Sequence, residues 1–92
     1  MKYNYYLTNG TKTEIDVEKP LSLDEMQKMV GGLIEFAEVK RTRHTICVNE
    51  EGLMMGLPEN PAFSYRDLGW DPTEMPGQLR GNIIEGQDGD TG

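Results

Sequence analysis

The chain has 92 residues, 36% hydrophobic and 27% charged, which predicts one small globular domain near the size limit for a single apolar core and leaves room for support from a homo-oligomer. Its net charge of −7 argues against direct nucleic-acid binding, because phosphate-backbone binders need a basic surface. With one cysteine, Cys47, and no apolar run near the roughly 20 residues of a membrane span, we expect a cytoplasmic protein without membrane contact.

Two stretches rich in tyrosine or in alternating polar and apolar residues, 2–8 and 12–17, flank Asn9-Gly10 and predict a β-hairpin. A two-residue turn would mix the apolar and polar faces, because a register slip of one residue turns every side chain over. We therefore expect a loop one residue longer. The expected cross-strand pairs are Tyr5 with Ile15 and Tyr3 with Val17.

A helix start is indicated twice, since Ser22 with Glu25 fits a capping box and Leu21 with Met26 fits a hydrophobic staple. The apolar stripe of this helix consists of Leu23, Met26, Met29 and Val30. Gly31-Gly32 is expected to end the helix through a left-handed cap. Two glycines exceed what a cap needs, which leaves two interpretations: a tight turn, or close approach of a ligand to the backbone.

Residues 33–39 carry apolar side chains on both faces, which predicts a central strand of a sheet. Residues 45–49 predict the next strand, with Ile46 and Val48 facing opposite to Cys47. The helix can cover only one face of this sheet, so a later segment or a partner chain is expected on the other. The basic connection at 40–43 is the best candidate for holding a phosphate or carboxylate.

No catalytic or metal site is predicted, and no cofactor. His44 and Cys47 have no further cysteine or histidine with which to bind zinc, and they lie on opposite faces of an extended strand, which excludes a Cys-His dyad. The competing hypothesis is a small carboxylate-dependent enzyme. It requires Glu35 and Glu50 to converge in one cleft.

After a turn at 49–52, residues 53–57 predict a short helical turn with Leu53, Met54 and Leu57 against the sheet. Residues 59–81 hold three prolines and several aromatic residues, and they predict an irregular loop of a length that is often functional. Two interpretations stay open for this loop. Either Phe63, Leu68 and Trp70 cover the open sheet face, or Tyr65, Arg66 and Trp70 form part of a pocket or partner surface.

The expected fold is α+β: a mainly antiparallel sheet of four or five strands, one main helix on one face, and the long aromatic loop closing the other. The last strand is expected at 82–85. The domain spans 1–86, and 87–92 form a polar flexible tail.

Several short pieces together resemble a family of small domains of unknown function from bacteriophages, plasmids and other bacterial mobile elements. The pieces are Val30-Gly31-Gly32, Ile34-Glu35, Val48 to Leu53, Gly56-Leu57-Pro58, Asn60 with Ala62, and Gly81 to Ile84. The family has no established activity, so the resemblance implies no catalytic residue. It implies a bacterial host cell as the setting.

The resemblance leads to the hypothesis of a non-enzymatic accessory protein that antagonises host defence or regulation. It would sequester a small nucleotide-type signal in a pocket or block a host protein through a flat surface. The candidate ligand-binding residues are Tyr6, Arg41, Arg43, His44, Tyr65, Arg66 and Trp70. Tyr6 is also explained as a solvated tyrosine on an open face. A further alternative is an acidic DNA mimic that uses Glu74, Glu85, Asp88 and Asp90.

Overall fold

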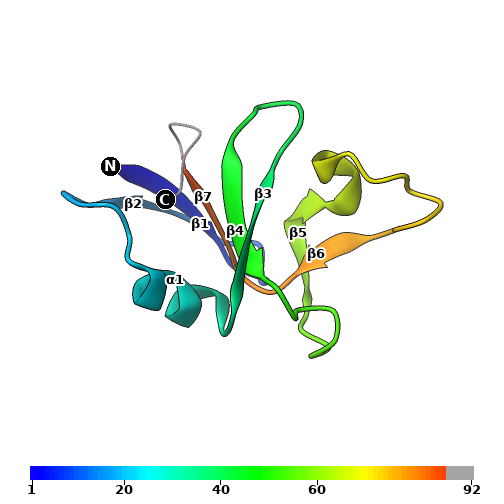
Figure 1. Ribbon diagram of the computed structural model, residues 1–92, viewed down its shortest axis with the longest axis horizontal. Helices are drawn as coiled ribbons and strands as arrows, with labels where there is room; N and C mark the ends of the chain where they lie inside the picture. The colour runs from blue at the N-terminus through cyan, green and yellow to red at the C-terminus, as the bar shows by residue number, and fades with distance from the viewer. Residues whose placement is uncertain (87–92) are drawn as a thin grey trace.

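In this computed structural model, which describes residues 1–86, five strands form an antiparallel sheet in the order β2-β1-β7-β4-β3, and two more form a small second sheet (Figure 1). The main-sheet strands are β1 (Lys2–Tyr6), β2 (Lys12–Asp16), β3 (Ile34–Glu38), β4 (Thr45–Asn49) and β7 (Ile83–Gly86). The others are helix α1 (Leu23–Val30), strand β5 (Glu59–Ser64), the 3₁₀ helix η1 (Tyr65–Leu68) and strand β6 (Gln78–Arg80). The expected α+β class is confirmed; the tail at 87–92 lies outside the described residues.

Helix α1 begins and ends as its sequence predicts. Ser22 and Glu25 form a reciprocal capping box, and Gly31 closes the helix in the left-handed conformation at φ 85°. Met26 and Val30 are buried in one cluster with Leu21, and this cluster also contains side chains of β1, β4 and β7. The prediction was wrong for Leu23, which is 58% exposed.

The β1–β2 hairpin has a loop of the expected length in a different register. Its loop is residues 8–10, because the Leu7 amide donates to the Thr11 carbonyl (2.9 Å) and Gly10 adopts φ 90°. The expected pairs were therefore wrong by two residues: Tyr3 lies opposite Ile15 and Tyr5 opposite Thr13. A shift of two preserves the face, so the apolar side chains still lie together.

Strand β3 is an edge strand, so its expected central position was wrong. The last strand, β7, inserts between β1 and β4 and takes the centre, where Ile83 and Ile84 are fully buried. The apolar residues on both faces of β3 have another cause: Ile34 packs against the α1 cluster, whereas Ala37 packs against the second cluster. Phe36, on the α1 side, is 47% exposed.

The second cluster lies under β5, η1 and β6. Its buried members are Val39, Ile46, Val48, Phe63, Leu79 and Ile83. The expected irregular loop at 59–81 is thus largely regular, and only residues 69–77 between η1 and β6 form turns. Phe63 and Leu68 pack over the sheet as one interpretation predicted, and the Phe63 ring meets Tyr6 edge to face with centroids 5.0 Å apart. Trp70 remains half exposed.

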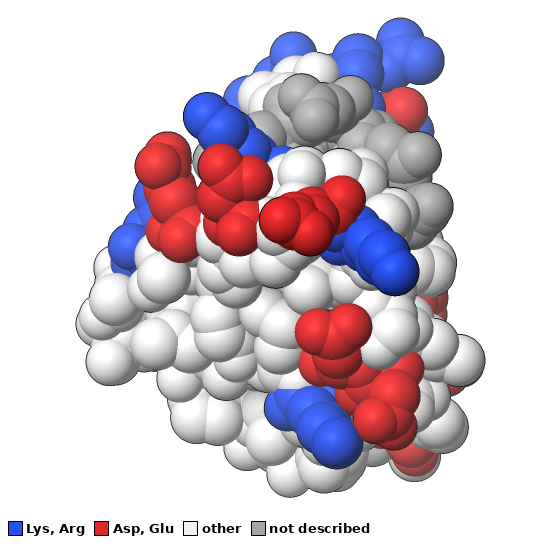
Figure 2. Space-filling model, turned by 90° about the vertical axis from the view of Figure 1, so that its left-hand side faces the viewer, with Lys and Arg blue, Asp and Glu red and all other residues white. Residues whose placement is uncertain are grey.

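The charge on the surface is mixed where β2 and α1 lie. Figure 2 shows acidic and basic side chains interspersed there, around a broad uncharged area. Within residues 1–86, no helix is both long and apolar enough to cross a membrane.

Candidate functional site

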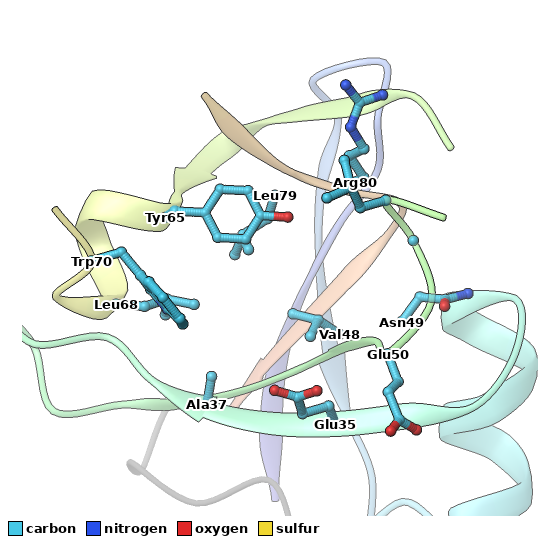
Figure 3. A pocket seen from close by; sticks show the side chains of 12 residues that line it. Glu35, Ala37, Val48, Asn49, Glu50, Tyr65, Leu68, Trp70, Leu79 and Arg80 are labelled. Atoms are coloured by element: carbon cyan, nitrogen blue, oxygen red, sulfur yellow. The ribbon is translucent and has the colours of Figure 1, made fainter. Parts of the chain in front are cut away.

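An open pocket of about 140 Å³ lies between the β3–β4 edge of the main sheet and the η1–β6 segment (Figure 3). Tyr65, Leu68 and Trp70 form one wall, while Ala37 and Val48 form the floor. This volume is of the order of a cavity that accepts one aromatic ring, about 150 Å³. The pocket therefore has the size and lining of a site for a single planar group.

Local hydrogen bonds hold the aromatic wall in place. The Asp67 carboxylate accepts from the Ser64 amide (2.8 Å), which starts η1, and Gly69 ends it in the left-handed conformation at φ 89°. The Asp67 carbonyl accepts from the Lys40 amide (2.9 Å), which ties η1 to the β3–β4 connection. The Trp70 amide donates to the Tyr65 carbonyl (3.2 Å), so both rings are presented by one short turn.

Two carboxylates line the pocket but do not converge. Figure 3 shows the Glu35 side chain turned into the pocket and the Glu50 side chain turned away from it. The convergence that the enzyme hypothesis requires is not present between these two side chains. Arg80, at the opposite rim, is already engaged: it donates to the Leu57 carbonyl (3.0 Å) and lies 3.7 Å from the Glu59 carboxylate.

A second polar group surrounds Glu85 in β7, on the sheet face that carries the second cluster. Its Oε1 accepts from Asn4 Nδ2 (3.0 Å) and from the Tyr6 hydroxyl (2.9 Å), and its Oε2 lies 3.2 Å from His44 Nδ1. Glu85 is only 6% exposed. We name Asn4, Tyr6, His44 and Glu85 the Glu85 cluster.

The hydrogen bonds of the Glu85 cluster change two pKa values. Burial, followed by the hydrogen bond to Glu85, raises the pKa of Tyr6 to about 12, and the charge of Arg41 opposes part of this rise. Burial alone raises the pKa of Glu85, but the hydrogen bonds from Asn4, Tyr6 and His44 outweigh burial and leave this pKa below its ordinary value. The cluster therefore holds a buried carboxylate in its charged form.

The predicted ligand-binding residues divide between two places. Tyr65 and Trp70 line the pocket, whereas Tyr6 and His44 belong to the Glu85 cluster. Tyr6 also borders an open hollow of about 220 Å³ with Lys12 and residues of β5. The remaining three predicted residues are arginines, which line neither hollow.

Two of these arginines, Arg41 and Arg43, lie in the β3–β4 connection, and the third, Arg66, lies on η1. Arg43 adopts a left-handed conformation at φ 62°, and its Nε lies 3.3 Å from the Glu38 carboxylate. Arg66 is exposed on η1. Arg41 is exposed on the β3–β4 connection.

Sequence reasoning missed the buried role of Glu85 and the partner role of Asn4. Glu85 is therefore not an exposed acid of a DNA mimic, and Asp88 and Asp90 lie outside the described residues. One signal was present: Glu85 follows two isoleucines in a short apolar strand, where a charge needs internal partners.

The structure also bears on Cys47 as a nucleophile and on the acidic, histidine and cysteine side chains as metal ligands. Cys47 is fully buried, and burial raises the pKa of its thiol to about 11, which disfavours the thiolate needed for nucleophilic attack. The described part of the chain has no group of three or more histidine, cysteine or acidic side chains placed to hold a metal ion.

The fold and the site define a small α+β domain with a ring-sized aromatic pocket at one edge of its sheet. The chain belongs to the DUF3846 family, a domain of unknown function, which matches residues 1–91. The predicted membership in a family of unknown function is thus confirmed, while its distribution among phages and mobile elements stays a prediction. Neither the curated proteins nor the solved structures contain a match.

Proposed function

We propose that this protein is a non-enzymatic accessory protein of a phage or mobile element, which acts in the cytoplasm of the bacterial host by binding. Its ligand is a small nucleotide-type molecule, and the protein binds this molecule through its nucleobase. Capture of the molecule antagonises host defence or regulation. The observation that supports the proposal is the ring-sized pocket with Trp70 and Tyr65 on its wall and the Glu35 carboxylate turned inward.

The chemistry of the pocket fits a nucleobase. A planar base stacks on an aromatic side chain, and Trp70 is 54% exposed at the pocket, so its ring is accessible to a ligand. When it is ionised, the Glu35 carboxylate can only accept hydrogen bonds, so it matches the amino groups of purines or cytosine, which donate them. Base stacking and one charged hydrogen bond therefore form the core of the proposed recognition.

The charge of the chain limits the rest of the ligand. Among residues 1–86, Arg80 is the one cation that lines the pocket, and it already has partners in Glu59 and the Leu57 carbonyl. Glu35 and Glu50 border the same pocket, so several phosphates close together would be repelled. We therefore expect a molecule with few phosphates, whose base provides most of the affinity.

Trp70 is the only tryptophan of the chain, which makes its fluorescence a direct reporter of the pocket. We expect guanosine monophosphate, adenosine monophosphate or a cyclic dinucleotide to quench this fluorescence with saturation. Glu35→Gln keeps the reporter and removes the charged acceptor, so affinity should fall by about 1.5–3 kcal/mol, roughly 10- to 100-fold. Glu14→Gln, in β2 at the opposite edge of the sheet, is the matched control and should bind as the wild type does.

Native mass spectrometry of the protein from a bacterial lysate gives a second test. An added mass that leaves on denaturation would identify a captured molecule and the oligomeric state. Unchanged fluorescence with all three probes at millimolar concentration, together with a bare protein mass, would contradict the proposal. Equal quenching of wild type and Glu35→Gln would reject the role of Glu35.

A further inference from the structure

Four large apolar side chains lie exposed on two neighbouring turns. The four are Leu33, Leu53, Met54 and Met55, which we name the Met54 surface. Met54 is 86% exposed, and the other three are each more than half exposed. This corrects the expectation that Leu53 and Met54 pack against the sheet. Three consecutive exposed apolar residues are costly to solubility, which is why such runs are rare without a function.

Hydrogen bonds join the two turns into one surface. The Glu50 amide donates to the Leu33 carbonyl (2.8 Å), which links the turn after α1 to the turn after β4. The buried Asn49 side chain donates to the Val30 carbonyl (3.2 Å) and lies 3.9 Å from the Met55 sulfur. Figure 1 shows both turns at the lower end of the molecule.

The exposure of the methionines is built into the turn at 50–57. Within it, the Met55 amide donates to the Glu51 carbonyl (2.8 Å) and the Leu57 amide to the Gly52 carbonyl (3.0 Å). Gly52 is packed so closely on β6 that an added Cβ would lie 2.9 Å from the Arg80 carbonyl oxygen. The turn is thus tied to the rest of the fold while its methionines face solvent.

Carboxylates border the Met54 surface. Glu50 and Glu51 directly precede Gly52 and are both exposed, and no ion pair among the described residues involves either of them. The cations of the nearby elements are already paired: Arg80 with Glu59 (3.7 Å) and Lys28 with Asp24 (3.3 Å). The surface is therefore apolar in its middle and negative at its border.

We propose that the Met54 surface docks an amphipathic helix, rich in lysine or arginine, of a partner protein. An apolar stripe of such a helix would cover Leu33, Met54 and Met55, and its cations would face Glu50 and Glu51. Methionine suits this role because its unbranched, polarisable side chain adapts to the shape of a partner. A second copy of the chain fits poorly, since its own carboxylates would meet those of the first.

The Met54 surface adjoins the pocket at Leu53, which belongs to the surface and also lines the pocket. Leu33, Met54 and Met55 do not line the pocket, and Figure 3 shows the Glu50 carboxylate turned away from it. Substitutions at Met54 and Met55 can therefore test the surface without removing Glu35 or Trp70. Failure of one proposal leaves the other standing.

The test is fluorescence anisotropy with a labelled synthetic helix of about 18 leucines and lysines, in which the leucines recur at i, i+3, i+4 and i+7. Two further peptides serve as controls: one of the same composition in scrambled order, and one with every lysine replaced by glutamate. We expect saturable binding of the amphipathic basic helix alone, weakening as salt rises.

The double variant Met54→Ser, Met55→Ser should bind this helix at least about tenfold more weakly. Leu23→Ser is the matched control, because Leu23 is also exposed but lies on α1 outside the surface, and its binding should be unchanged. Circular dichroism and the nucleotide titration should be the same for all three proteins.

Three results would overturn the inference. One is that the scrambled peptide binds as tightly as the amphipathic helix, because binding would then depend on the net charge of the peptide and not on an apolar helix face. Another is equal binding by the double variant and the wild type. The third is a dimer in sedimentation velocity that the double variant abolishes, which would assign the surface to a second copy.

Discussion

The Glu85 cluster and the Met54 surface depart from the usual distribution of side chains in opposite directions. Glu85 is a carboxylate at 6% exposure, and Met54 is an apolar side chain at 86% exposure. Burying a charge costs free energy unless the charge is hydrogen-bonded, and exposing an apolar side chain forgoes the gain of burial. The buried charge therefore requires compensating contacts, whereas the exposed apolar side chain would gain free energy from a contact that covers it.

The two regions differ in where that contact lies. Asn4, Tyr6 and His44 surround Glu85 within the same chain, so the Glu85 cluster is complete in itself. Met54 is 86% exposed, and Met55 is half exposed, with its sulfur 3.9 Å from Asn49 Nδ2. We interpret the first region as structural and the second as a surface for a partner, and three substitutions test this comparison.

The largest effect is expected at the buried charge. Glu85→Ala removes the carboxylate that Asn4, Tyr6 and His44 contact, and should lower the free energy of unfolding by about 3 kcal/mol, measured by urea denaturation at neutral pH. The control Glu14→Ala, in an exposed position of β2, should stay within about 0.5 kcal/mol of the wild type.

The effect of Glu85 should also depend on pH. Its pKa is lower in the folded protein, so its contribution is present above the unfolded pKa and is lost as pH falls through the folded pKa. The difference between wild type and Glu85→Ala should therefore shrink in acid. A loss below about 1 kcal/mol at neutral pH would mean that solvent replaces these hydrogen bonds without cost.

An intermediate effect is expected at Tyr6. Its pKa rises from 10.0 to about 12 on folding, so its contribution is present below pH 10 and is lost as pH rises through 12. Tyr6→Phe should cost about 1 kcal/mol at neutral pH and flatten the loss of stability above pH 10. Burial also raises the pKa of Cys47 to about 11, so the measurement is the difference between wild-type and variant unfolding curves across this range. Identical pH profiles would show that the hydroxyl proton is not held by Glu85.

The smallest effect is expected at the Met54 surface. Met54→Ser removes an apolar side chain with little buried area, so thermal unfolding should change by less than about 0.5 kcal/mol. A matched substitution of a buried methionine, Met26→Ser, should destabilise the protein by several times that amount. A large loss at Met54 would place its side chain inside the fold and remove the basis for a docking surface.

The sequence predicted those parts of the fold whose conformation depends on residues close together in the chain. The capping box at Ser22, the left-handed cap at Gly31 and the bounds of β4 all follow from patterns within a few residues. The cover of the second face by Phe63 and Leu68 was one of two open interpretations. The edge position of β3 was not predictable, because it depends on β7 pairing with β1 and β4.

In the candidate site, too, contacts within one short segment were easier to predict than contacts between distant segments. A pocket or partner surface formed by Tyr65, Arg66 and Trp70 was one of two open interpretations; one short turn places Tyr65 and Trp70 in the lining of the pocket, but Arg66 is not part of that lining. Arg41, Arg43 and His44 were expected in that pocket with them. His44 instead faces Glu85, a residue 41 positions later, and Tyr6 meets Glu85 across 79 positions.

The sequence by itself determined the class of this domain, its helix and most of its strands, because capping and alternation are local interactions that each stabilise one conformation. Only the tertiary structure decided which strands are neighbours, that Glu85 is buried among three distant partners, and that Met54 faces solvent. These outcomes depend on pairings between residues far apart in the chain, each of small free energy, whose sum selects one arrangement.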